Sequence, residues 1–226
     1  MAGVITKLAV QVRNRERVDV FVDEVYVCAV SLARAATLRK GQPLNDGELA
    51  DLRADGELDW AYERSLRYLG GRPRSSAEVR DYLRDKGYES PVVEAVLARL
   101  VARGYVDDEA FARFWVENRN RFRPRGARAL RYELRQKGVD SEVIAETLEE
   151  QDEDAVAWHL VAGKLARWRD LERAEFDQKV MGLLARRGFG YATCRRVCER
   201  AWQSLADDGE TAGEDEECGD GDGSDR

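Results

Sequence analysis

Apolar residues recur every three or four positions along most of the chain, which is the pattern of helices that bury one face. Leu83 stands four residues before Gly87 and Val79 stands eight before it, so both lie on one helix face. The same arrangement recurs twice, with Leu130 and Leu134 before Gly138 and with Val180 and Leu184 before Gly188. The three glycines are 51 and then 50 residues apart. This fixed period predicts a mainly α-helical protein built from three tandem repeats of about 50 residues.

Each repeat is predicted to contain three helices, with the middle one ending at the shared glycine. Glycine adopts the left-handed conformation that ends a helix at low cost. Lys86, Lys137 and Arg187 precede the glycines, where the helix dipole favours a cation. Ser75 and Glu78 form the spacing of a capping box for the first middle helix. The outer helices are expected at 58–69 and 90–103, at 109–122 and 141–150, and at 154–169 and 191–205.

Residues 4–30 alternate between apolar and polar positions and are rich in valine, which predicts β-strands. Asn14-Arg15 and Asp23-Glu24 are candidate turns, so we expect a small antiparallel meander. A helix should follow from Ser31 to Lys40, with Gly41 ending it. Asn45 or Asp46 can cap the next helix, in one or two pieces, to about Leu69.

These patterns divide the chain into five parts. They are an N-terminal meander and helix at 1–56, repeats at 57–106, 107–153 and 154–206, and an acidic tail at 207–226. The tail lacks large apolar side chains, so it is predicted to be disordered. It carries a net charge of −9, whereas the whole chain carries −7, which leaves +2 for residues 1–206. The charge is therefore segregated between a weakly basic body and an acidic tail.

The densest charge cluster is a basic run in the second repeat. The run consists of Arg119, Arg121, Arg123, Arg125, Arg128, Arg131, Arg135 and Lys137. Glu133 is the only acidic residue within it, so the net charge is +7 over nineteen residues. The run crosses the Pro124–Gly126 break between two predicted helices. Clustered arginines at this point could bind phosphates or an acidic groove of a protein filament. The alternative is a merely solvated helix face.

Two weaker basic clusters occupy other repeats. Arg72 and Arg74 lie at the equivalent turn of the first repeat, and Arg195, Arg196 and Arg200 lie in the third. Arg72 and Arg74 are further candidates for partner contact. Aromatic residues between the arginines could stack on bases, although their helical spacing favours core packing.

The sequence carries no pattern typical of a catalytic or metal centre. It has no phosphate-binding Gly-x-x-x-x-Gly-Lys loop and no His-Glu-x-x-His motif, and no nucleophile stands near the single histidine. Cys194 and Cys198 occupy core positions of the third repeat, and Asp107 with Asp108 is best interpreted as a helix cap. We therefore expect neither an enzyme nor a cofactor. The sequence has neither a signal-like start nor an apolar run of membrane-spanning length, so we expect a cytoplasmic protein. We also expect it to be a monomer.

Several segments together resemble the RecX family of regulatory proteins. They include Ser65-Leu-Arg-Tyr-Leu, the stretch from Arg74 to Tyr88, and Glu133-Leu-Arg-Gln-Lys-Gly-Val139. The most specific segment is Gly104-Tyr-Val-Asp-Asp-Glu-Ala-Phe-Ala112, which joins the first two repeats. The resemblance covers about residues 4–203 and is strongest over 65–150.

The resemblance implies a function that periodicity alone does not. RecX proteins bind the RecA filament on single-stranded DNA, lodge in its groove, and usually restrain recombination and co-protease activity without catalysing a reaction. The alternative is a helical module that binds DNA directly, without RecA. The charge of only +2 without the tail argues against strong autonomous DNA binding.

Overall fold

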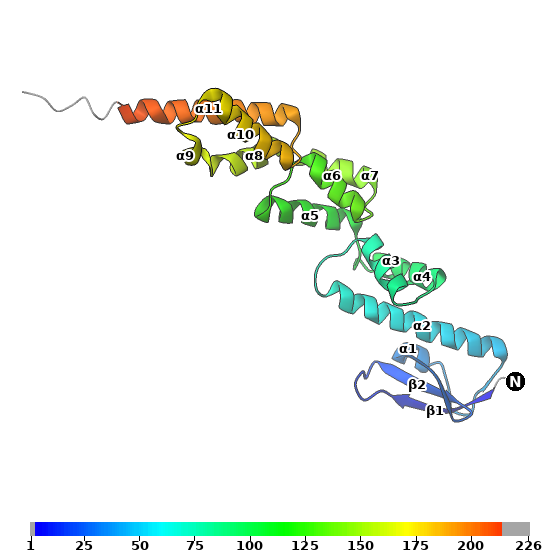
Figure 1. Ribbon diagram of the computed structural model, residues 1–226. Coiled ribbons are helices and arrows are strands. Elements are labelled where there is room, and N and C mark those ends of the chain that lie inside the picture. The colour runs from blue at the N-terminus through cyan, green and yellow to red at the C-terminus, as the bar shows by residue number, and fades with distance from the viewer. Residues whose placement is uncertain (1–2, 214–226) are drawn as a thin grey trace, which may run out of the picture. The chain divides into compact units, whose positions relative to one another are not determined.

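The structure is a computed structural model and describes residues 3–213 (Figure 1). It is mainly helical, with a small antiparallel sheet at the N-terminus, as the sequence predicts. The chain forms two compact units, Met1–Phe111 and Ala112–Arg226, so the division falls within the first helix of the second repeat. None of the helices in the described part combines the length and apolar character needed to cross a membrane.

The predicted meander consists of β1 (Gly3–Val10), β2 (Arg17–Val22) and β3 (Val25–Ser31). Asp23 and Glu24 form the turn between β2 and β3 with positive φ angles of 47° and 66°, as tight hairpins require. A fourth strand, β4 (Pro43–Leu44), pairs with the start of β1 and completes the order β3-β2-β1-β4. Two residues are too few for an alternating pattern, so the sequence did not reveal this strand.

The helix predicted from Ser31 to Lys40 is wrong in length. Helix α1 spans only Leu32–Ala35. The chain then turns back to β1, because Gly41 N donates to Ile5 O and Ile5 N donates to Gln42 O, at 2.8 and 2.9 Å. These backbone hydrogen bonds to β1 use groups that a longer helix would need for its own hydrogen bonds. They also fix the position of residues 41 and 42, which lead into β4.

Helix α2 (Asp46–Leu69) packs against the sheet and also forms the first helix of the first repeat (Figure 1). Asn45 and Glu48 form a capping box at its start. Leu52 packs into the core beneath the sheet, whereas Ala61 and Tyr62 pack with Val79 in the core of the repeat. The boundary predicted between residues 56 and 57 therefore falls inside one continuous helix.

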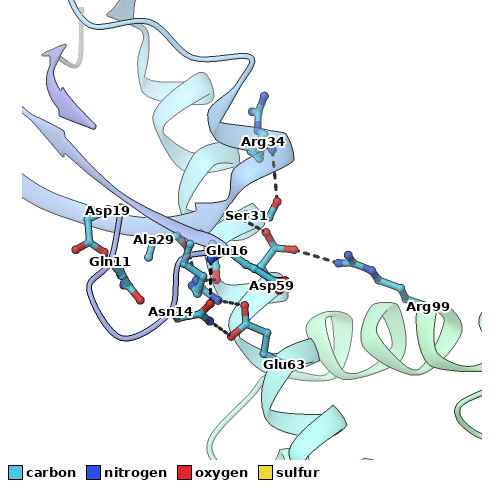
Figure 2. Close-up of polar contacts among 12 residues, drawn as sticks. Gln11, Asn14, Glu16, Asp19, Ala29, Ser31, Arg34, Asp59, Glu63 and Arg99 are labelled. Atoms are coloured by element: carbon cyan, nitrogen blue, oxygen red, sulfur yellow. Dashed lines mark hydrogen bonds and ion pairs between the residues drawn. The ribbon is translucent and has the colours of Figure 1, made fainter. Parts of the chain in front are cut away.

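Polar contacts fasten the sheet to the helices of the first repeat (Figure 2). The Asp59 carboxylate of α2 accepts hydrogen bonds from Ser31 N at 2.9 Å and from Arg99 Nη1 at 3.0 Å. Burial alone would raise the pKa of Asp59, but these hydrogen bonds outweigh it and lower that pKa. Glu63, one turn further along, accepts from Asn14 Nδ2 and from the almost fully buried Arg17.

The remaining helices complete the three repeats. The first repeat adds α3 (Ser76–Asp85) and α4 (Ser90–Ala102); the second has α5 (Asp108–Phe122), α6 (Ala127–Gln136) and α7 (Ser141–Glu149). The third has α8 (Glu153–Ala162), α9 (Leu165–Trp168), α10 (Arg173–Arg186) and α11 (Tyr191–Gly213). The single helix predicted at 154–169 is thus divided at Gly163 and Lys164.

The last helix, α11, continues past its expected end near Leu205 to Gly213. Residues 207–213, for which the composition predicts disorder, therefore belong to this helix. The rest of the predicted acidic tail lies outside the described residues.

The shared glycines end their helices as predicted. Gly87, Gly138 and Gly188 have φ angles of 86°, 69° and 87°. In each repeat the following amide donates to the leucine carbonyl five residues back, at 3.2 Å, which is the Schellman arrangement. The apolar positions four and eight residues before each glycine are fully buried, and Cys194 and Cys198 are buried in the third core.

Candidate interaction surface on the second repeat

The predicted basic run is divided by its only acid, Glu133. One carboxylate oxygen of Glu133 accepts from Arg119 Nε at 2.7 Å and from Trp115 Nε1 at 2.8 Å. The other oxygen lies 3.8 Å from Arg125 Nε. Arg119 and Lys137 also lie over the Trp115 ring, at 4.7 and 5.3 Å from its centroid. These three cations are therefore engaged within the repeat, against α5 and one side of α6.

The opposite side of α6 carries a different set, which we name the arginine face: Arg128, Arg131 and Arg135, with Tyr132 between them. The spacing i, i+3, i+4 and i+7 places all four side chains on one stripe of the helix. All four are exposed, and Tyr132 keeps 65% of its surface accessible. Among the residues described, no carboxylate forms an ion pair with the three arginines. Arg128 Nη2 donates a hydrogen bond to the backbone carbonyl of Ala185, at 3.4 Å.

The first repeat shows what the arginine face lacks. Arg80 occupies the position of Arg131, and its guanidinium binds both carboxylate oxygens of Glu94, at 2.8 and 3.3 Å. The residue of the second repeat that corresponds to Glu94 is Ala145. The same helix position is thus neutralised in one repeat and left charged in the next.

Two further arginines of the run are also exposed. Arg121 lies near the end of α5 with its guanidinium 5.2 Å from the ring centroid of Phe122, and Phe122 itself is 66% exposed. Arg123 follows in the break before α6. Together with the arginine face they give the second repeat five exposed cations without an ion pair in the described part of the chain.

The predicted residues Arg72 and Arg74 lie at the turn between α2 and α3 and make local contacts. Arg72 forms two hydrogen bonds with Glu78, at 2.7 and 3.0 Å, and these bonds raise the pKa of its guanidinium. Arg74 lies 4.1 Å from the ring centroid of Tyr68, which stacks in parallel on Tyr82. Arg72 thus binds the turn to α3, and Arg74 packs against Tyr68 of α2.

The predicted helix cap at Asp107 and Asp108 is confirmed, with a difference. Asp107 accepts from Ala110 N and caps α5, whereas Asp108 accepts from Ser76 N and caps the first turn of α3. Glu153 does the same for Ala127 of α6, at 2.7 Å. Within the described residues, no group of three His, Cys, Asp or Glu side chains is arranged to hold a metal ion.

Two features of this surface escaped the sequence reasoning. The i, i+3, i+7 spacing of Arg128, Arg131 and Arg135 is visible in the sequence once α6 is placed, and it could have separated these residues from the rest of the run. The role of Glu133 could not be found in this way, because its partner Trp115 belongs to another helix.

Fold and surface together define a tandem three-helix repeat protein with an exposed, positively charged face on its second repeat. Residues 61–100 match the family model for the first three-helix domain of RecX, and 107–148 match that for the second. Residues 3–45 match the N-terminal domain of regulatory protein RecX. The chain belongs to the RecX family of regulatory proteins, as the resemblance of its motifs predicts.

Individual relatives agree with this assignment. The regulatory protein RecX of Bacillus subtilis is 32% identical over 194 residues, which cover 83% of this chain and 73% of that protein. That of Mycobacterium sp. strain JLS is 44% identical over 136 residues, or 57% of this chain and 74% of that protein. A crystal structure of regulatory protein RecX superposes with a TM-score of 0.72 over 87% of this chain and 99% of that one, at 24% identity. The RecX structure from Lactobacillus salivarius gives 0.59 over 64% and 96%, at 19% identity. These two structures support the fold.

Proposed function

We propose that this chain binds the RecA filament on single-stranded DNA and restrains its recombinase and co-protease activities, in the regulation of DNA repair. The observation that carries the proposal is the arginine face of α6, which presents three cations without an acidic partner among the described residues. Arginine binds carboxylates and phosphates in a planar, two-pronged geometry, so this face suits an anionic groove made of protein and nucleic acid. Arg121 and Arg123 add charge to the same repeat.

The direct test is RecA ATP hydrolysis on single-stranded DNA, with purified protein added, together with co-sedimentation with the filaments. We expect hydrolysis to fall and the protein to sediment with the filaments. A variant with Arg128→Gln, Arg131→Gln and Arg135→Gln should lose both effects while keeping its helical circular-dichroism signal. Unchanged hydrolysis and absence from the pellet for the natural chain would refute the function.

A matched control uses the same helix positions in the first repeat. Arg80→Gln and Arg84→Gln correspond to Arg131 and Arg135, but Arg80 is already paired with Glu94. This double variant should retain filament binding. If it weakens binding as much as the α6 variant, the contact depends on overall charge and the assignment to α6 is wrong.

The alternative function, direct binding of DNA, is favoured by one observation. Tyr132 is exposed between arginines, and an aromatic ring flanked by cations can stack a base beside the phosphates. Binding to single-stranded DNA without RecA, measured over a salt series, distinguishes the two functions. Tight binding that weakens steeply with salt, and is lost with Tyr132→Ala, would favour the DNA-binding module.

A further inference from the structure

A groove beside the N-terminal sheet is lined by two exposed aromatic side chains. It lies between the edge strand β3 and helix α2, and its volume is about 450 Å³. Tyr26 of β3 is 54% exposed and Trp60 of α2 is 42% exposed, so both rings reach solvent. Phe21 of β2 extends this surface, because its ring packs edge-on against Tyr26 at 5.8 Å between centroids. The volume is in the range of small-ligand sites, so a flat group can enter beside these rings.

Arg17 supports the Trp60 ring from its buried side. The Arg17 side chain lines the groove, and the residue is only 1% exposed. Its guanidinium carbon lies 5.1 Å from the centroid of the Trp60 ring. One Nη atom donates to Glu63 at 3.3 Å, and the other donates to the carbonyls of Ala29 and Gly56. Because these bonds hold the guanidinium in place, the ring rests on a fixed support and keeps its exposed part toward solvent.

A row of cations runs along α2 through Trp60. Arg53, Arg64 and Arg67 lie seven, four and seven residues from Trp60, which places them on the same side of the helix. Arg67 lies over the Trp60 ring, 5.6 Å from its centroid. Within the described part of the chain, none of the three arginines forms an ion pair. Glu57 is the one acidic residue in this row, so the row carries a net charge of +2.

Two other carboxylates near the groove are engaged by neighbouring side chains. Glu63 accepts from Asn14 Nδ2 at 3.1 Å as well as from Arg17, and Figure 2 shows Asn14 and Glu63 pointing toward one another. Asp19 accepts from Gln11 Nε2 at 2.6 Å. The charge of Glu63 is therefore matched by Arg17, and neither carboxylate pairs with an arginine of the α2 row.

This combination of rings and cations fits single-stranded nucleic acid. Bases stack on exposed aromatic rings, and arginines beside the rings bind the phosphates of the same strand. The row from Arg53 to Arg67 extends about 21 Å along the helix, so more than one nucleotide can lie on it. A duplex hides the faces of its bases, and a peptide of aspartate and glutamate has no ring to stack. The aromatic rings therefore favour a single strand over these partners.

We propose that Tyr26, Arg53, Trp60, Arg64 and Arg67, which we name the Trp60 groove, bind single-stranded nucleic acid, with bases against the rings and phosphates at the arginines. The groove belongs to the first compact unit, whereas the arginine face of α6 belongs to the second. A protein filament on single-stranded DNA presents both kinds of partner. The role of the groove at the filament therefore rests on the proposed function, whereas its contact with nucleic acid does not.

The contact is tested first by nuclear magnetic resonance of the full chain, without RecA. The chain has five tryptophans, and Trp60→Phe identifies the indole N–H signal of Trp60. We expect that signal to shift when an oligothymidylate of about ten nucleotides is added at low salt. The signals of Trp168 and Trp202, which pack in the core of the third repeat, should stay in place. An unmoved Trp60 signal, or a shift of Trp115 alone, would overturn the proposal. So would an equal shift with a glutamate peptide of the same charge, because it would show that stacking is not involved.

The contributions of stacking and charge are separated by the affinities of variants. Trp60→Leu should weaken oligothymidylate binding about tenfold, because one stacked base is lost, and Trp60→Phe should retain most of the affinity. Changing Arg53, Arg64 and Arg67 to glutamine should also weaken binding and make it less dependent on salt. Unchanged affinity in the triple variant would refute the site even where Trp60→Leu fails to fold, since circular dichroism can verify that the arginine variant is intact.

The matched control removes three exposed cations from elsewhere in the same unit, namely Arg39, Lys40 and Arg84, by change to glutamine. It should bind oligothymidylate more tightly than the variant of the α2 row. Equal losses in the two triple variants would reflect net charge alone and would refute the groove. Loss with Tyr132→Ala but not with Trp60→Leu would place the nucleic acid on α6 instead. RecA is absent from all these measurements, so the groove and the RecA proposal can fail separately.

Discussion

Gly126 lies directly against the backbone of Phe189. A Cβ atom at Gly126 would be 2.3 Å from Phe189 N and 2.4 Å from Gly188 O, both of which are main-chain atoms. The turn that ends α10 therefore packs against the N-terminus of α6. This contact joins the second repeat to the third. Only glycine leaves room for this approach.

Gly126→Ala should destabilise the unit formed by the second and third repeats. The added methyl group must push two backbones apart, at a cost of about 2–3 kcal/mol in the free energy of unfolding. Urea denaturation followed by tryptophan fluorescence measures this loss. Gly163→Ala is the matched control, because Gly163 has a φ of −65° and no atom within 4 Å of an added Cβ. Equal stability of the two variants would contradict the packing at Gly126.

Glu133→Gln should increase the affinity of the second repeat for anionic partners. The change removes the carboxylate that holds Arg119 and Arg125, so both guanidinium groups become available. We expect a several-fold gain in binding of single-stranded DNA or RecA filaments at low salt. Glu146→Gln removes the same charge from an exposed position of α7. If both variants gain equally, the effect comes from net charge and Glu133 does not restrain the arginines.

Acid should weaken the N-terminal unit in part through Asp59. Burial acts to raise the pKa of Asp59, but hydrogen bonds from Arg99 and Ser31 prevail and lower it below its ordinary value of 3.8. The folded state therefore holds the ionised form more tightly than the unfolded chain does. The resulting stability is present above about pH 4 and is lost as the pH falls through the lowered pKa. The natural chain and Asp59→Asn should be compared by their urea midpoints from neutral to acid pH. The difference between the two midpoints should shrink as the pH falls. Asp51→Asn, exposed on the same helix, should leave the pH dependence unchanged.

The Cys198 thiol should be inert in the folded protein. Burial and a 3.3 Å contact with Asp177 raise the pKa of Cys198 to about 12 from an ordinary value of 9.0. The folded state therefore keeps its proton where the unfolded chain releases one, so stability should fall as the pH rises above 9.0. Mass spectrometry after iodoacetamide treatment should find Cys198 unlabelled in the native chain and labelled in urea. Rapid labelling of the native chain would contradict this environment.

The sequence predicts those parts of the fold that depend on local chemistry. The stripe of Val79 and Leu83, and its two counterparts, identifies the buried helix faces, and Gly87 marks a helix end because the left-handed conformation excludes most other residues. Local pattern fails at α1, where hydrogen bonds between Gly41 and Ile5 override a sequence that could continue as a helix. The sequence also did not reveal the break between α8 and α9 at Gly163 and Lys164.

For the interaction surface, the sequence by itself determined that the second repeat is strongly basic, and the family motifs identified the kind of protein. Only the tertiary structure decided which cations remain available. Glu133 engages Arg119 because α5 packs beside α6. Arg131 has no ion pair among the described residues, because Ala145 stands where Glu94 neutralises Arg80 in the first repeat. The physical reason is that charge is a property of each residue, but its neutralisation depends on side chains that approach from other helices.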